Sequence, residues 1–121
     1  MELFQMESNR VERYRDARLE VDFHAQAVLL DGAIVHLTRM EFSLLAQLAR
    51  SAGDIVSRDT LMLNVWGYGP EIQTRTMDVH LRRLRVKLGS YSRQHLETVF
   101  GLGYRLQPCG VPRALTHAAG A

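Results

Sequence analysis

The sequence predicts an α+β fold in which a small antiparallel sheet is followed by three helices and a closing β-hairpin. Alternating apolar and polar residues come first, then three segments with helical spacing, then two strand-like runs joined by a Gly-x-Gly. The chain has 121 residues, of which 46% are hydrophobic and 23% are charged. This length and composition are typical of a single globular domain.

Composition also indicates the cellular setting. The chain has no apolar run near the roughly 18 residues that a membrane span needs. Its N-terminus is acidic and polar, unlike a secretory signal. The single cysteine, Cys109, cannot form an internal disulfide. We therefore expect a cytoplasmic protein with no membrane partner.

The first third of the chain shows the pattern of strands. Leu19, Val21 and Phe23 alternate with acidic residues, so they lie on one face of an extended segment. Further along, Asp31-Gly32 separates two short apolar runs, and this dipeptide favours a tight hairpin turn. Three or four antiparallel strands are expected.

Two helices are predicted next from their capping residues. Thr38 and Glu41 fit a capping box at the start of an amphipathic segment that stops before Gly53. Ser57 is a suitable N-cap for the second helix, and Gly67 ends it.

A third helix is predicted from Gln73 or Thr74 to Leu88, just before Gly89. Between residues 74 and 88 it carries five cationic side chains and one acidic one, so its formal charge is +4 although the whole chain carries only +2. On a helical wheel one face is apolar and the opposite face is basic. The apolar face consists of Met77, Leu81, Leu84 and Leu88, and the basic face is centred on Arg75, Val79, Arg82 and Arg83.

Two interpretations of the basic face are open: a solvated helix surface, or a surface for nucleic acid. Val79 favours the second, because solvation gives no reason for a branched apolar residue there, whereas a thymine methyl group does. In a helix-turn-helix the second helix enters the major groove, with its N-terminal half nearest the bases. On that geometry the base candidates are Arg75, Thr76, Val79, His80 and Arg83, and the phosphate candidates are Arg82, Arg85 and Lys87.

Three runs resemble, in order and spacing, the C-terminal effector domain of OmpR/PhoB-type response regulators: LTRMEFSLLAQLARSAGDIVSRDTLMLNVWGYG, TRTMDVHLRRLRVKLG and LETVFGLGYRL. These regulators are bacterial winged-helix transcription factors of two-component systems. The resemblance implies a winged helix-turn-helix DNA-binding domain over residues 17–107. Residues 1–16 are then expected to be a linker or tail, and residues 108–121 a disordered tail.

The resemblance implies sequence-specific binding of double-stranded DNA, with residues 74–88 in the major groove and the wing, 96–106, toward the minor groove and backbone. The DNA-contacting positions of the family fall on Arg75, Thr76, Val79, His80, Arg82, Arg83, Arg85, Thr98, Phe100 and Tyr104. A segment that contacts RNA polymerase in the family falls on Gly67, Tyr68, Gly69, Pro70, Glu71, Ile72 and Gln73.

The same resemblance implies structural roles for two more residues, and it implies a dimer and an additional domain. Trp66 matches a residue that packs in the core near the DNA backbone, and Asp78 matches an acid paired with a neighbouring arginine. Tandem dimers on direct repeats are implied, as is a receiver domain in a full-length parent. A receiver domain needs about 100 residues of its own, so we expect an excised effector domain, with a single-domain relative as the alternative.

Phe100 departs from the family pattern, which often has an arginine there for the minor groove. Phenylalanine has no charge for a narrow, negative groove. Either the wing contact is apolar, or it is weakened, or Phe100 folds onto the domain; we favour the last.

Other functions fit the sequence less well. No enzyme, cofactor or metal site is expected, because the five histidines are scattered and Gly101-Leu102-Gly103 lies between strands rather than before a helix. A protein-interaction module should expose an apolar third helix, and this one is basic. RNA binding usually needs exposed stacking aromatics, for which the candidates are Tyr68, Phe100 and Tyr104.

Overall fold

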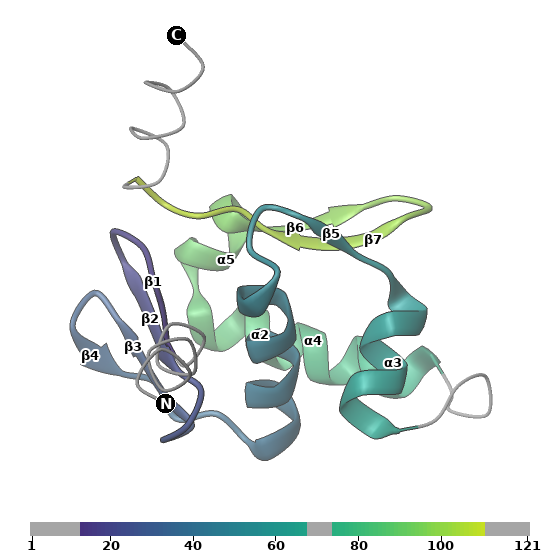
Figure 1. Ribbon diagram of the computed structural model, residues 1–121, viewed down its shortest axis with the longest axis horizontal. Helices are drawn as coiled ribbons and strands as arrows, with labels where there is room; N and C mark the ends of the chain where they lie inside the picture. Colours follow the sequence, from purple (N-terminus) through teal and green to yellow (C-terminus); the bar gives the residue numbers. More distant parts are fainter. Residues whose placement is uncertain (1–12, 68–73, 111–121) are drawn as a thin grey trace, which may run out of the picture.

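The computed structural model describes residues 13–67 and 74–110, and Figure 1 shows their arrangement. A four-stranded sheet lies at one end, α2 and α3 lie beside it in turn, α4 crosses behind them, and a three-stranded sheet runs along one side. The elements in chain order are β1 (Arg13–Arg15), β2 (Leu19–Asp22), β3 (Ala27–Leu30), β4 (Ala33–Ile34), α2 (Arg39–Arg50), β5 (Ile55–Val56), α3 (Arg58–Trp66), α4 (Thr74–Leu88), α5 (Ser90–His95), β6 (Leu96–Val99) and β7 (Gly103–Leu106).

The N-terminal sheet is antiparallel with the order β1-β2-β3-β4, as the sequence predicts. Leu19 and Val21 are fully buried on one face of β2, which confirms the alternation. Asp31 and Gly32 have φ values of 53° and 85°, and two successive positive φ angles are those of the tight turn expected between β3 and β4. The sheet begins at Arg13, earlier than the expected boundary at residue 17, because β1 pairs with β2.

The carboxylate of Asp16 fixes this sheet to the helical part of the domain. Asp16 is buried and accepts hydrogen bonds from the hydroxyls of Tyr14 and Tyr91 and from the backbone N–H groups of Arg18 and Leu19. Burial opposes ionisation of Asp16, but these four hydrogen bonds outweigh it and hold its pKa below the usual value. Since Tyr91 belongs to α5, the bond joins the N-terminal sheet to the helix that precedes β6.

The capping signals position α2 and α3 as expected. Thr38 Oγ1 accepts from the N–H of Glu41, and Glu41 Oε1 accepts from the N–H of Thr38 at 2.9 Å, which completes the capping box. Ser57 Oγ accepts from the N–H of Thr60 at 3.0 Å at the start of α3. Gly67 ends α3 in the left-handed conformation, with φ 81°.

Two short elements differ from the sequence prediction. The described chain contains four helices rather than three, because α5 follows α4 directly after Gly89. It has six residues and no side-chain cap, so it leaves no helical period to detect. The closing sheet has three strands rather than two, because Ile55 and Val56 pair with Arg105 and Tyr104 of β7. A strand of two residues is too short to show alternation.

One buried core lies between the helices and the two sheets. The apolar stripe of α4 is at most 3% exposed, which confirms the predicted face; it comprises Met77, Leu81, Leu84 and Leu88. Within residues 13–67 and 74–110, no helix has both the length and the apolar character to cross a membrane.

The two glycines of the closing hairpin have different roles. Gly101 has φ 81° and lies in the reversal between β6 and β7, where an added Cβ would meet nothing within 4 Å. Gly103 has φ 150°, and an added Cβ would lie 2.1 Å from the carbonyl oxygen of Val56. Gly103 therefore allows β5 to lie against β7, whereas Gly101 serves the turn itself.

We expect Gly103→Ala to lower the free energy of unfolding by roughly 3 kcal/mol or more, because the clash is with backbone that cannot rotate away. Gly101→Ala is the matched control and should cost about 1 kcal/mol, from its left-handed φ alone. Urea denaturation of the two variants measures the difference. Equal losses would show that the approach of Val56 to Gly103 does not constrain the hairpin.

Candidate nucleic-acid interface

One face of α4 is exposed on the surface of the domain. Arg75, Arg82 and Arg83 are exposed there, and none of the three forms an ion pair with another described residue. Val79 lies among them with 39% of its surface exposed. The structure therefore places these candidates together on one surface, where their charges are available to a partner.

Two other cations of α4, Lys87 and Arg85, form hydrogen bonds within the domain. Lys87 Nζ donates to Glu41 Oε1 at 2.7 Å, and Glu41 is only 1% exposed. Burial opposes ionisation of this carboxyl, but Lys87 and Thr38 outweigh it and keep its pKa below the usual value. The Lys87 ammonium thus joins α4 to the start of α2, and the contact of Lys87 with phosphate stays a prediction, because an ammonium has three donors and this side chain is 37% exposed.

Arg85 connects α4 to the wing. Its Nη2 donates to Thr98 Oγ1 at 2.8 Å and to the backbone oxygen of Leu96, both in β6. The guanidinium also lies 5.9 Å from the centre of the Tyr104 ring. Arg85 and Thr98, two residues that the sequence singles out separately, are thus in direct contact and partly buried.

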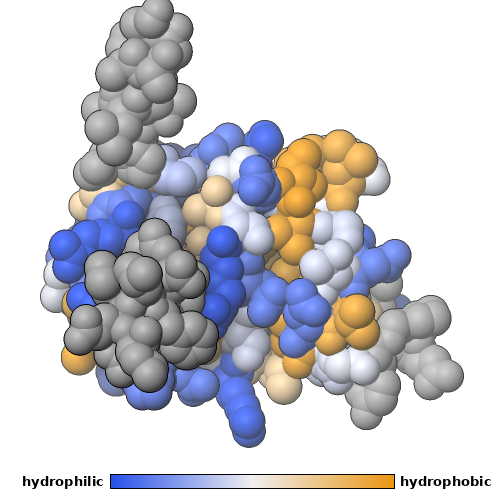
Figure 2. All heavy atoms as spheres, viewed as in Figure 1, coloured by the Kyte–Doolittle hydropathy of each residue, from blue (hydrophilic) through white to orange (hydrophobic). Residues whose placement is uncertain are grey.

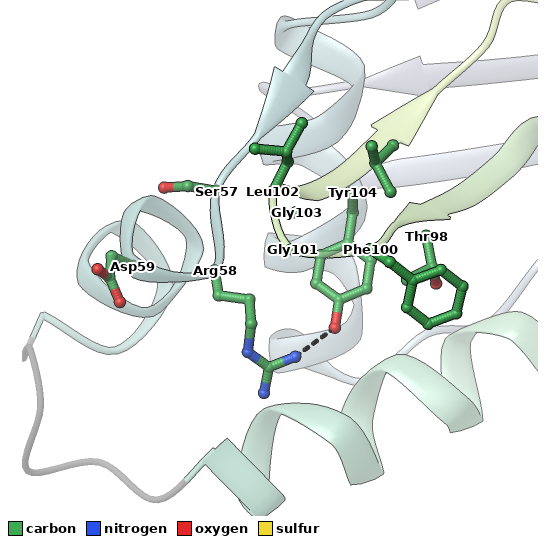
Figure 3. A pocket seen from close by; sticks show the side chains of 10 residues that line it. Ser57, Arg58, Asp59, Thr98, Phe100, Gly101, Leu102, Gly103 and Tyr104 are labelled. Carbon is green, nitrogen blue, oxygen red and sulfur yellow. Dashed lines mark hydrogen bonds between the residues drawn. The ribbon is translucent and has the colours of Figure 1, made fainter.

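Arg58 holds α3, α4 and the wing in one arrangement. One guanidinium nitrogen donates to the Tyr104 hydroxyl of β7, and another lies 3.2 Å from Asp78 Oδ1 of α4. Figure 3 shows the Arg58 side chain reaching from the start of α3 toward that hydroxyl. The expected pairing of Asp78 with an arginine is confirmed. Tyr104 is 5% exposed, so it lies behind the surface formed by the other candidates.

Sequence reasoning missed Arg58. Its partners Asp78 and Tyr104 are 20 and 46 residues away along the chain, so no local spacing connects them.

His80 and Trp66 meet at the N-terminal side of the α4 surface. Their ring centres are 5.7 Å apart, and Trp66 packs partly buried against the core, as expected. His80 is half-buried, and its Nδ1 has no hydrogen-bond partner among the described residues. Thr76 is also half-buried. Of the expected polymerase-contact segment, Gly67 ends α3 and residues 68–73 lie outside the described residues.

The tip of the wing is apolar. Phe100 is 90% exposed and Leu102 is 61% exposed, and apolar side chains gather at this end of the hairpin in Figure 2. The favoured expectation that Phe100 folds onto the domain is wrong, because the residue lies in the turn beyond β6, away from the core. The nearby charges of Glu97 and Arg105 pair with each other at 2.7 Å.

Comparison with known proteins identifies the family. Residues 32–106 match the family model described as "Transcriptional regulatory protein, C terminal". The chain belongs to this family. Within it, the order of sheet, helices and wing is that of an OmpR/PhoB-type effector domain, which confirms the resemblance seen in the sequence.

Curated and solved relatives agree with this family. The response regulator ArlR of Staphylococcus aureus is 39% identical over 87 residues, which are 71% of this chain and 40% of that protein. The chain thus spans about two fifths of the length of ArlR. The DNA-binding domain of Klebsiella pneumoniae RstA, solved in complex with the RstA box, has a TM-score of 0.73 and 32% identity over 80% of this chain and 98% of that one.

Two further solved structures have the same fold. The DNA-binding domain of Escherichia coli CpxR has a TM-score of 0.71 and 29% identity over 81% of this chain and 98% of that one. DrrB of Thermotoga maritima, described as an OmpR/PhoB homologue, has a TM-score of 0.70 and 28% identity over 79% of this chain and 44% of that one.

Proposed function

We propose that this effector domain binds double-stranded DNA in a sequence-specific way and serves as the DNA-reading part of a bacterial two-component transcription regulator. The observation that carries the proposal is the exposed face of α4, where Arg75, Arg82 and Arg83 surround Val79 without internal ion-pair partners. Unpaired arginines on the exposed face of a helix whose opposite face is buried in the core suit the major groove. The RstA domain, which is similar to this one, was solved on its DNA box.

The N-terminal half of α4 takes the role of reading bases. Arg75 and Arg83 present planar forks that match the O6 and N7 acceptors of guanine, and Val79 fits a thymine methyl group. Thr76 and His80 are half-buried, so they contact bases at the edge of this surface.

Other residues position the duplex. We assign Arg82, Arg85 and Thr98 to phosphate contacts, which fix the register of a protein on DNA. Tyr104 supports Arg58 and Arg85 from behind rather than touching DNA, since it is only 5% exposed. Phe100 extends the wing past the domain surface, so its contact with the sugar edges of the minor groove is apolar.

The proposal extends to the parent protein. We infer that the domain is the C-terminal part of a cytoplasmic response regulator with a receiver domain, and that it binds direct repeats as tandem dimers. Residues 67–73, between α3 and α4, are the segment proposed to contact RNA polymerase. In this role the domain is not an enzyme.

A protein-interaction module is the second candidate, because Phe100 and Leu102 expose apolar surface at the wing tip. The salt dependence of duplex binding separates the two functions. If five phosphates are contacted, affinity for duplex DNA should fall about 500-fold between 50 and 200 mM salt. A flat response, or no binding to any duplex, would favour the protein-interaction module.

Replacing Arg83 tests the base-reading surface. We expect Arg83→Ala to remove about 1–3 kcal/mol of preference for a selected site over random duplex, because a bidentate base contact is lost. Binding titrations on both duplexes measure the preference. Arg15→Ala, on the N-terminal sheet, removes the same charge away from α4 and is the control. An unchanged preference in Arg83→Ala would place that side chain away from the bases.

Replacing Phe100 tests the wing. Phe100→Arg should raise affinity for random duplex and make the slope of log affinity against log salt steeper by about 0.9, because one more phosphate is neutralised. Phe100→Ala removes the ring without adding charge and should leave the slope unchanged. Identical slopes for the wild type and Phe100→Arg would mean that position 100 does not approach DNA.

A further inference from the structure

A second concave surface, which we call the arginine groove, lies beside the exposed face of α4. The C-terminal half of α4, α5 and β6 form it, and its volume is about 520 Å³. The cationic residues of its wall are Arg82, Arg85 and Arg93. Arg93 belongs to α5 and has no place in the sequence-based site. Arg82 belongs both to this groove and to the exposed face of α4, so the two surfaces are continuous.

The charge of the groove is positive. Glu97 is the one acidic residue in its wall, and it accepts hydrogen bonds from Arg105 Nε at 2.7 Å and from Gln107 Nε2 at 3.3 Å. The Arg105 guanidinium lies outside the wall and neutralises this carboxylate. Three arginine charges therefore face the groove with no uncompensated anion beside them, which is the electrostatic signature of an anion site.

Two of the three arginines have their donors available. Arg93 and Arg82 are exposed, and neither forms a side-chain hydrogen bond or an ion pair within the described part of the chain. Arg85 donates to Thr98 Oγ1, so this oxygen is already an acceptor and its O–H remains free to donate outward. The hydroxyl of Ser92 is used by the backbone oxygens of Arg85 and Gly89.

We propose that the arginine groove binds a backbone phosphate of the DNA and that Arg93 is a phosphate-binding residue. The inference rests on the proposed function. A duplex that receives α4 in its major groove carries the phosphates of one strand past Arg82 and into the groove. There the anionic oxygens accept hydrogen bonds from the guanidinium groups of Arg82 and Arg93 and from the Thr98 hydroxyl. These contacts carry no base information, so α5 sets affinity and register rather than sequence preference.

A carboxylate of an acidic protein segment has similar chemistry, but continuity with the α4 surface favours the DNA phosphate. The two occupants differ in what replacing Arg93 does to duplex binding. If the groove binds an acidic protein segment instead, replacing Arg93 should leave the affinity for duplex DNA and its salt slope as they are in the wild type.

The first test compares Arg93→Ala, Arg93→Lys and Arg15→Ala on a selected duplex and on a random duplex. Arg93→Ala should lose one phosphate contact. The slope of log affinity against log salt should then become shallower by about 0.9, and the affinity at 0.1 M salt should fall about eightfold, equally on both duplexes. Arg93→Lys keeps the charge and should keep the slope. Arg15→Ala has the same net charge as Arg93→Ala, but its side chain lies on β1, so its slope should be that of the wild type.

The second test replaces single phosphates of the selected duplex with neutral methylphosphonates. One position should weaken the wild type more than it weakens Arg93→Ala, because Arg82 and Thr98 still contact that phosphate in the variant. If the wild type binds no duplex, the proposed function fails and the groove proposal fails with it. If the wild type binds but Arg93→Ala behaves as Arg15→Ala, or if every methylphosphonate weakens both proteins equally, the groove proposal alone is overturned. Circular dichroism of each variant shows that it is folded.

Discussion

The guanidinium of Arg58 joins α3, α4 and the wing, and it acts beside the direct contact of Arg85 with the wing. It stands at the first residue of α3 and bonds to a hydroxyl in β7 and a carboxylate in α4. Its ion pair with Asp78 is partly exposed and contributes at most about 1 kcal/mol to stability. Its importance is geometric, because a charged fork that bonds in two directions fixes two elements to a third. Arg85 joins α4 to β6 as well, but of these two arginines only Arg58 also connects α3 to α4 and the wing.

The cations of the domain divide into two groups with different roles. The first group has partners inside the domain. Arg58 bonds to Asp78 and Tyr104. Arg85 bonds to Thr98 and Leu96, and Lys87 bonds to Glu41. Each of these contacts joins two different elements, and the partners are 11 to 46 residues apart along the chain. The outward-facing arginines of α4 and α5 have no such partners among the described residues. Counting the charges in the sequence cannot show which cations belong to which group. Lys87, for example, pairs with Glu41 of the capping box, which is 46 residues away along the chain.

Local signals in the sequence predicted most of the fold. The capping box at Thr38, the Asp31-Gly32 turn and the apolar stripe of α4 are each defined by residues that are at most four positions from the next one, so short spacing reveals them. β5 and α5 escaped prediction because two and six residues give no measurable period. Arg58 and Arg93 escaped it because their roles depend on tertiary neighbours. Phe100 was misjudged, since only the path of the hairpin shows that its tip projects from the core.

Selection of sequences from a random pool of duplex DNA tests the central claim most directly. The whole chain is immobilised, bound duplexes are amplified, and the enriched sequences are compared with the starting pool. The account predicts enrichment of a short motif, repeated in the same direction if domains bind in tandem, and loss of that enrichment in Arg83→Ala. A folded protein that enriches no sequence over the starting pool would contradict the assignment of α4 as a base-reading helix.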